Sequence, residues 1–366
     1  MTWLPADPAE GSVSMQRYWL ELWRVVKERG GEEWISSPLG EPAYPIERAS
    51  RLYRALRNYL LYPRLASRAG DEGGIYHILD HSYVHLAKGL RRGDPLVVTV
   101  HDLIPLRDES GLTPSQVSRF RRRMEWLKRA DRIVAVSKFT RGEVIKLMGV
   151  SPERIVVVPN GTAFELVESE RPRGEVAERI EKLGRGGIVR LLAVGSNLAR
   201  KNLGILPTVC RRLRERGVEC AVIKVGAVFP EGLREELRVE VGQEGVIELG
   251  LISDGLLKWV YENSDILFFP SRLEGFGIPV IEAMQCGCRV VCSREASLPE
   301  VGGDVAFYFD VDDSEEAAVR VMEAIRDEGG RGDAGRAWAE RFTWDRHFDG
   351  LMETYRSLAR GGTAGK

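Results

Sequence analysis

Residues 271–284 read SRLEGFGIPVIEAM and directly follow the apolar run ILFFP at 266–270. The apolar run is short and aromatic, which predicts a buried strand. Two glycines, Gly275 and Gly277, let the backbone turn sharply, and Pro279 suits the first turn of a helix, where a missing N–H costs nothing. A strand, a glycine turn and a helix N-terminus in this order form an anion site, because unpaired amides and the helix dipole both favour phosphate.

Two carboxylates frame this turn: Glu274 precedes it, and Glu282 lies about one turn into the predicted helix. Carboxylates so placed are suited to accept hydrogen bonds from sugar hydroxyls rather than to hold phosphate. The stretch therefore predicts a site for a diphosphate with a sugar on either side, which is a nucleotide sugar. The alternative is that strand, turn and helix are generic to doubly wound folds and that both glutamates are solvated.

The EGFG turn with Glu274 and Glu282, the following IPVIEAM, Gly287 and the segment 297–301 (SLPEV) resemble the donor site of retaining glycosyltransferases of family 4. The similarity runs through nearly the whole chain. It implies the GT-B fold: an α/β protein of two Rossmann-like, doubly wound domains whose parallel sheets face each other across a cleft, with a C-terminal helix crossing back to the first domain. It also implies that Glu282 contacts the ribose, that Glu274 contacts the donor sugar, and that the turn binds the donor through Gly275, Phe276, Gly277 and Ile278.

The composition fits a globular protein with a substantial core, since 43% of the 366 residues are hydrophobic and 29% charged. We expect a cytoplasmic protein, because no apolar run has the length of a membrane span and the N-terminus lacks the layout of a signal peptide. The five cysteines are odd in number, which argues against disulfides. We expect no metal, because Cys286, Cys288 and Cys292 lack paired zinc-ligand spacing. Basic residues exceed acidic ones in the N-terminal half and acidic ones dominate the rest, which suggests an anionic partner for the former.

Apolar runs alternate with amphipathic stretches throughout, which predicts parallel sheets covered by helices. This alternation is interrupted by a charged, glycine-rich stretch before residue 188. We predict an N-terminal acceptor-side domain, a linker, a nucleotide-sugar-binding domain and a returning helix, at residues 1–165, 166–187, 188–342 and 343–366. One departure from the family concerns the start, where only residues 1–5 precede the first loop: either the first strand is very short or the start codon is misplaced.

A second motif, VGSNLARKN at 194–202, ends the first predicted strand of the second domain. Gly195 permits close backbone approach, and Arg200 and Lys201 place two cations where a diphosphate leaving group would develop charge. This resembles the family's phosphate-binding basic pair, although Ser196 stands where many relatives have arginine. The alternative is two surface cations at the start of a helix. For the nucleobase, the family's binding segment corresponds to Leu251 and Ile252.

A third motif, His101-Asp102, follows the strand-like run 96–100, and ligands of open α/β sheets bind at such strand ends. The resemblance places this pair beside the transferred sugar. Asp80 and His81 follow the preceding strand and are predicted to face the acceptor, as are residues Gly11 and Ser12 of the first loop. His77, His81 and His85 do not read as a metal site, because His77 ends a strand.

The family implies that catalysis depends on electrostatic stabilisation of the leaving group by Lys201, Arg200 and the amides after Gly275, with attack from the leaving-group face. A glycosidase-like acid and nucleophile pair is rejected, because both glutamates belong with sugar hydroxyls. The predicted donor is GDP-mannose, followed by UDP-glucose or UDP-N-acetylglucosamine, and the acceptor a glycan, a lipid-linked sugar or a small molecule of cell-envelope polysaccharide synthesis. Two alternatives remain: a catalytically reduced membrane-associated partner protein, and a nucleotide-sugar epimerase on the same fold.

Two arginine-rich stretches lie in the basic half. Arginines recur at every third position from 48 to 57 beside Tyr53, Tyr59 and Tyr62, and a second cluster spans 119–129. Basic residues and aromatic rings suit the surface of an anionic membrane. We expect either peripheral contact with the inner face of the membrane or solvated helix faces. Nothing resembles a motif that reads nucleic acid, so no nucleic-acid partner is expected.

Overall fold

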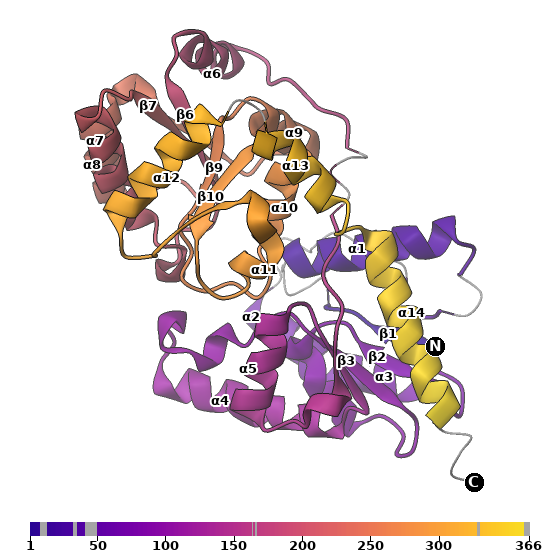
Figure 1. Ribbon diagram of the computed structural model, residues 1–366. Helices are drawn as coiled ribbons and strands as arrows, with labels where there is room; N and C mark the ends of the chain where they lie inside the picture. The colour runs from indigo at the N-terminus through magenta and orange to yellow at the C-terminus, as the bar shows by residue number, and fades with distance from the viewer. Residues whose placement is uncertain are drawn as a thin grey trace. The chain divides into compact units, whose positions relative to one another are not determined.

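The protein, represented by a computed structural model, forms two compact α/β units (Figure 1). The structure describes residues 1–7, 13–31, 35–40, 50–162, 164, 167–327 and 330–361. Unit 1 comprises Met1–Asp108, Leu112–Gly161 and Trp344–Lys366, and unit 2 comprises Glu109–Gly111 and Thr162–Thr343. Each unit has its own parallel sheet and its own buried apolar core, which confirms the predicted class of two Rossmann-like α/β domains, although among the described strands only the sheet of unit 2 is doubly wound.

The sheet of unit 1 has five parallel strands in the spatial order β1-β2-β3-β4-β5, which is also their order along the chain. Strands β1 to β4 are buried along nearly their whole length, as expected for a sheet covered on both faces, whereas the edge strand β5 buries only Ile155. Strand β1 has only three residues and pairs with β2, so the first strand is very short. The bounds are β1 Thr2–Leu4, β2 Tyr76–Ile78, β3 Leu96–Val100, β4 Arg132–Ala135 and β5 Ile155–Val157.

The helices of unit 1 include one π-helical turn, η2, between α2 and α3. Several 3-10 segments follow strand ends, of which η3 (His81–Lys88) after β2 is the longest. The bounds are α1 Val13–Glu28, α2 Arg51–Leu56, η2 Arg57–Leu61, α3 Tyr62–Arg68, α4 Pro114–Met124, α5 Lys138–Met148 and α14 Trp344–Gly361.

The C-terminal helix α14 returns to unit 1 and packs against α1, which it crosses (Figure 1), as the resemblance implied. Its Tyr355 hydroxyl accepts a hydrogen bond from Trp3 Nε1 at 3.0 Å and lies 2.5 Å from His77 Nδ1. His347 Nε2 lies 2.8 Å from the Tyr18 hydroxyl. Burial lowers the pKa of His77 and lowers that of His347 to about 4, so both imidazoles are neutral near pH 7. Helix α14 is thus fixed by buried hydrogen bonds as well as by apolar packing.

The sheet of unit 2 has six parallel strands in the order β11-β10-β9-β6-β7-β8. The chain builds β6, β7 and β8 in one direction and then returns to add β9, β10 and β11 on the other side of β6, so this sheet is doubly wound. The reversal falls between β6 and β9, and among the described strands it occurs in this unit only. The bounds are β6 Val189–Gly195, β7 Cys220–Gly226, β8 Val246–Gly250, β9 Ile266–Phe269, β10 Arg289–Ser293 and β11 Phe307–Phe309.

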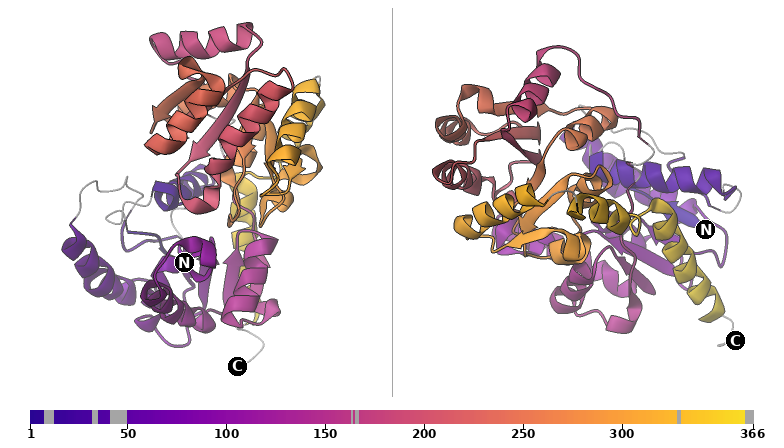
Figure 2. Two further views of the ribbon diagram at one scale, coloured as in Figure 1. Left: turned by 90° about the vertical axis from the view of Figure 1, so that its left-hand side faces the viewer. Right: turned by 45° about the horizontal axis from the view of Figure 1, so that its top comes forward.

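Helices cover both faces of this sheet (Figure 2). Helix α7 contacts α8 and α12 on one face, and α10 contacts α9 and α13 on the other. The predicted linker contains α6, which buries Ala177 and Ile180 and belongs to unit 2, so this charged stretch is not an extended connection. The bounds are α6 Glu175–Arg185, α7 Leu206–Glu215, α8 Glu231–Val241, α9 Asp254–Glu262, α10 Ile278–Gln285, α11 Leu298–Gly302, α12 Ser314–Arg326 and α13 Gly330–Ala339. None of the helices that the structure describes combines the length and apolar character that crossing a membrane requires.

Candidate functional site

Two loops leave the sheet of unit 2 where its strand order reverses. One follows β6 and begins at Gly195, and the other follows β9 and spans residues 270–277. Because β6 and β9 are neighbouring parallel strands, both loops lie at the same edge of the sheet. The carboxyl edge at a reversal of strand order is where open α/β sheets bind ligands, because the connections leave it toward opposite faces. The two strongest sequence motifs of this unit therefore meet at the position that favours a binding site.

The two motifs contact each other directly through ion pairs. Lys201 Nζ lies 2.6 Å from Glu274 Oε1, and Arg200 Nη1 lies 3.1 Å from Glu274 Oε2. Two hydrogen bonds add to this: Arg200 Nη1 donates to the Leu273 carbonyl at 2.9 Å, and the Arg200 carbonyl accepts from the Arg272 amide at 2.7 Å. These contacts fix the position of both cations relative to the EGFG turn.

The charges of this cluster do not cancel. Burial alone would raise the pKa of Glu274, but the positive charges of Lys201 and Arg200 outweigh burial and lower it, so the carboxyl is ionised at neutral pH. Two cations then face one carboxylate, which leaves a positive excess. Lys201 Nζ also lies 4.8 Å from the centre of the Phe269 ring, a cation–π contact that neutralises no charge. The cluster is suited to an anion.

The turn itself is held from the opposite side by Ser297. Its hydroxyl group is within donating distance of two carbonyls, that of Phe276 at 2.7 Å and that of Glu274 at 3.0 Å. Gly277 has φ = +110°, and a Cβ there would approach Leu298 to 2.9 Å, so only glycine fits this position. Ser297 was quoted in the sequence motif but not among the predicted site residues, and its role becomes visible only through these two contacts.

The predicted donor-binding side chains differ in exposure. The Phe276 ring is buried and packs at 5.8 Å against Phe342, so this residue offers its backbone and not its ring. Ile278 begins α10 and is half-buried. Glu282 is buried inside α10, where one carboxylate oxygen accepts a hydrogen bond from the Tyr261 hydroxyl at 3.0 Å. Its assignment to the ribose stays a prediction.

Three neighbouring strands, β6, β7 and β8, each end in a glycine with left-handed φ: Gly195, Gly226 and Gly250. Ser196 follows the first of them and is half-buried. Leu251 follows the third and is 93% exposed, beside half-buried Ile252. Two further exposed apolar residues, Leu198 and Val228, lie in the loops that follow β6 and β7 at the same edge. Leu198 and Val228 could not be predicted from the sequence, because single apolar residues in loops carry no pattern.

The predicted residues of unit 1 form a cluster of their own at the carboxyl ends of β2 and β3. His101 is buried, its Nε2 donates to the Leu79 carbonyl at 2.9 Å, and burial lowers the pKa of its imidazole. His81 lies beside it, with ring centres 6.2 Å apart. Asp80 caps η3 by accepting from the Ser82 amide, and Asp102 accepts from the Ile104 amide. All four side chains thus have structural contacts, and their roles toward a sugar stay predictions.

Two remaining predictions concern the first loop and metal binding. Gly11 and Ser12 lie outside the described residues. In the described part of the chain, no group of three or more His, Cys, Asp or Glu side chains has the geometry to hold a metal ion.

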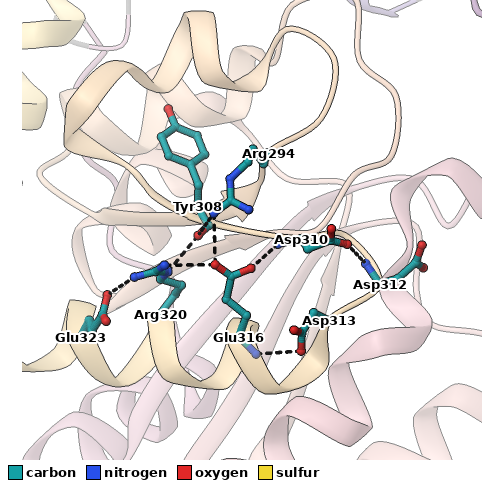
Figure 3. A network of polar contacts seen from close by, with 8 residues as sticks. All are labelled: Arg294, Tyr308, Asp310, Asp312, Asp313, Glu316, Arg320 and Glu323. Atoms are coloured by element: carbon teal, nitrogen blue, oxygen red, sulfur yellow. Dashed lines mark hydrogen bonds and ion pairs between the residues drawn. The ribbon is translucent and has the colours of Figure 1, made fainter.

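A second network of polar side chains lies at the edge strand β11 and stabilises the fold (Figure 3). Arg294 and Arg320 both donate to the Tyr308 carbonyl and both pair with Glu316. The cavity beside them measures about 310 Å³ and is also lined by Arg331. These arginines cover backbone carbonyls that a free sheet edge would expose, which protects the edge from pairing with another strand. The charges of Arg294 and Arg320 are balanced by the carboxylates of Glu316 and Glu323, so this pair lacks the positive excess of the Lys201 cluster.

Comparison with known proteins agrees with the fold. Residues 15–165 match the family model described as Glycosyltransferase Family 4, and residues 178–341 match Glycosyl transferases group 1. O-antigen chain mannosyltransferase B of Escherichia coli is 29% identical, over 64% of this chain and 62% of that protein. D-inositol 3-phosphate glycosyltransferase of Segniliparus rotundus is 27% identical, over 78% of this chain and 67% of that protein. The matched region is thus about two thirds of the length of these relatives.

A likeness in structure covers more of the chain. Anabaena Alr3699/HepE, solved in complex with UDP and glucose, has a TM-score of 0.71 at 17% identity, over 97% of this chain and 99% of that chain. At this identity the likeness establishes the GT-B fold alone. The two family models, which together cover residues 15–165 and 178–341, show that the chain belongs to the group 1 and family 4 glycosyltransferases.

Proposed function

We propose that the protein is a hexosyltransferase that moves a sugar from a nucleotide diphosphate to an acceptor with retention of configuration. The observation that carries this proposal is the cluster of Lys201, Arg200 and Glu274 at the reversal of strand order in unit 2. The cations and the first turn of α10 would hold the diphosphate, and the carboxylate would bind a sugar hydroxyl. Family membership supports the reaction class.

The chemistry that these residues supply is charge stabilisation. A nucleoside diphosphate is a good leaving group that needs its developing negative charge compensated rather than a proton. Glu274 is a poor general acid, because the two cations keep it ionised. Attack from the leaving-group face would give retention, with a phosphate oxygen of the donor taking the proton of the acceptor hydroxyl. No metal is required in this scheme, since Lys201 and Arg200 supply the positive charge.

For the donor we propose GDP-mannose first and UDP-glucose or UDP-N-acetylglucosamine next. A mannosyltransferase among the relatives supports the first, and a structural neighbour solved with UDP and glucose supports the second. The exposed Leu251 and the adjacent Ile252 are proposed to contact the base. We place the acceptor, a glycan or lipid-linked sugar, near His101 and Asp102 in unit 1.

The test is donor turnover without and with acceptor. Purified protein is incubated with each of the three donors, and release of nucleoside diphosphate and the anomeric form of the product are followed by NMR. We expect slow release from one donor, an unchanged anomeric configuration, and a large loss in Lys201→Met but not in Lys258→Met, which removes a lysine that donates to the Val167 carbonyl. Isomerised donor without transfer would indicate an epimerase, and binding without turnover a catalytically reduced partner protein; either result would refute the proposal.

A separate proposal concerns the membrane. The surface of α2, η2 and α3 exposes an unusual series of large apolar side chains: Leu52, Tyr53, Leu56, Tyr59, Leu60, Leu61 and Leu65. Contiguous exposed apolar surface beside arginines is typical of helices that lie in a membrane interface. Of the arginines predicted to face the lipid, Arg57 instead pairs with buried Asp7 at 2.9 Å and stabilises the fold. We infer that Arg54 and Arg64 attract anionic lipid while the apolar side chains insert.

Vesicle co-sedimentation tests this inference. Wild type should bind anionic vesicles at low salt and be released as salt rises, since the Debye length is about 10 Å at 0.1 M. Leu52→Ser with Tyr59→Ser should abolish binding even at low salt. The matched control is Arg119→Glu with Arg122→Glu on α4, which changes charge where no such apolar series is exposed. Equal loss in both variants, or no binding by wild type, would mean that these helices do not insert into the bilayer.

A further inference from the structure

Lys224 is a buried cation directly behind the loop of the proposed donor site. It lies on β7 within the apolar run AVIKVG and is fully buried. Its Nζ donates to the Gly195 carbonyl at 2.5 Å and to the Val225 carbonyl at 2.9 Å. A lysine inside an apolar strand is costly, because burial penalises the ammonium form. Its presence therefore calls for an explanation in terms of what it contacts.

No carboxylate of the described residues forms an ion pair with Lys224. The charged groups that face it are Lys201 from the loop after β6 and Glu248 from β8. Glu248 is already bound by Arg234 Nε at 2.6 Å and by the Phe229 amide at 2.5 Å. Burial and the charge of Lys201 lower the pKa of Lys224 to about 8, so it is mostly protonated at pH 7. The protonated amine thus lacks a counter-ion of its own.

The contact with Gly195 fixes the direction of the next amide. In a trans peptide the carbonyl of one residue and the N–H of the following one point in opposite directions. Because the Gly195 carbonyl is held inward by Lys224 and the Ala227 amide, the N–H of Ser196 points away from the sheet interior. Among the described residues this N–H has no hydrogen-bond acceptor.

Two neighbouring observations locate this amide beside the cation cluster. Gly226 lies so close that a Cβ there would be 2.5 Å from the Gly195 oxygen, which holds the two strand ends together. On the other side, Lys201 Nζ is 3.9 Å from the Cβ position of Gly195. The free amide, Lys201 and the buried Lys224 are therefore grouped around one glycine.

We propose that Lys224 is a positioning residue for the donor diphosphate: it holds the Gly195 peptide so that the Ser196 amide donates to a phosphate oxygen, and its buried charge adds to the attraction of that phosphate. This inference rests on the proposed function, because it requires a nucleoside diphosphate at this edge of the sheet. The phosphate in turn serves as the counter-ion that Lys224 lacks. Binding should therefore favour the protonated lysine.

The experiment is calorimetric titration of UDP and GDP between pH 6.5 and 9.5. Wild-type affinity should fall as the pH rises through about 8, and binding at pH 8 should take up protons, read from buffers of different ionisation enthalpy. Lys224→Met should bind about tenfold more weakly at pH 7 and lose the proton uptake. Lys224→Arg keeps its charge at every pH, so it should bind without the decline above pH 8. The control Lys258→Met should behave as wild type.

The outcomes separate this inference from the function on which it rests. Failure of wild type to bind either nucleotide would refute the proposed function and this inference with it. Wild-type binding with an unchanged affinity and pH profile in Lys224→Met would refute the role of Lys224 alone. If Lys224→Met does not fold, the wild-type measurement decides, since binding without proton uptake at pH 8 contradicts the proposal.

Discussion

The ionic contact between the two motifs of unit 2 predicts a measurable coupling between Lys201 and Glu274. Both side chains are nearly buried, with exposed fractions of 12% and 11%, and their charged atoms are 2.6 Å apart. Replacing Lys201 with methionine leaves Glu274 in a site that excludes water, with Arg200 at 3.1 Å as its remaining partner. Replacing Glu274 with glutamine leaves the two cations without their carboxylate.

Removing one partner of a buried pair typically costs about 3–5 kcal/mol, because the other charge remains desolvated. Arg200 compensates for part of this loss, so we expect Lys201→Met to lower the free energy of unfolding of unit 2 by about 2 kcal/mol. The double variant Lys201→Met/Glu274→Gln should be more stable than the sum of the single effects predicts, by about 1–2 kcal/mol.

The assay is hydrogen–deuterium exchange in increasing denaturant, because peptides of unit 2 report this unit separately from unit 1. The pH gives a second criterion. The lowered pKa of Glu274 means that its ionic contacts stabilise the folded state above its unfolded pKa, and that this stability is lost as the pH falls through the folded pKa. The loss of unfolding free energy in Lys201→Met should therefore be smaller in acid, where the Glu274 carboxyl becomes protonated. A double-mutant cycle that shows no coupling free energy between Lys201 and Glu274 would refute this reasoning. So would a loss of unfolding free energy in Lys201→Met that does not change with pH.

Three further predictions concern the folds of the two units. Gly226→Ala should destabilise unit 2 by about 1–3 kcal/mol, because φ is +98° and the methyl group would contact the Gly195 oxygen. The control Gly232→Ala, in open space on α8, should not destabilise it, and equal melting temperatures of the two variants would contradict the prediction. Tyr355→Phe should cost unit 1 about 1–3 kcal/mol in denaturant unfolding, because buried groups lose their partner, and a loss below about 0.5 kcal/mol would count against it. Because the pKa of His347 is lowered to about 4, the free energy of unfolding of unit 1 should fall by up to about 3 kcal/mol as the pH falls from about 6.5 to about 4. His347→Gln should lack this part of the pH dependence. An unchanged dependence of stability on pH in the variant would show that His347 is not its origin.

Much of the fold could be predicted from the sequence because its signals are local. The runs at 266–269 and 96–100 are continuous and apolar, as strands buried on both faces must be, and both form strands with these bounds. The turn after β9 could be predicted because glycine, glycine and proline restrict the backbone by themselves. Helix α6 was missed because it buries only two residues, so its apolar stripe is too narrow to outweigh its charges.

The contacts of the site could not be predicted, because they join residues that are distant in sequence. Glu274 was assigned to a sugar hydroxyl from its place in a motif, but its pairing with Lys201 depends on how β6 and β9 lie side by side. Lys224 is a single charge within an apolar run and belongs to no motif, and only the position of the Gly195 carbonyl gives it a partner. Arg57 was grouped with other arginines by its spacing, whereas its contact with Asp7 spans 50 residues.

The most direct test of the donor site is a hydrogen–deuterium exchange footprint of wild type with and without GDP or UDP at low salt. The amides of the proposed site belong to residues 195–201 and 271–282. If one of these nucleotides binds at the reversal of strand order in unit 2, both segments should exchange more slowly in its presence, and the Lys201→Met variant should lose this protection. Protection confined to other segments, or none with either nucleotide, would contradict the assignment of the donor site.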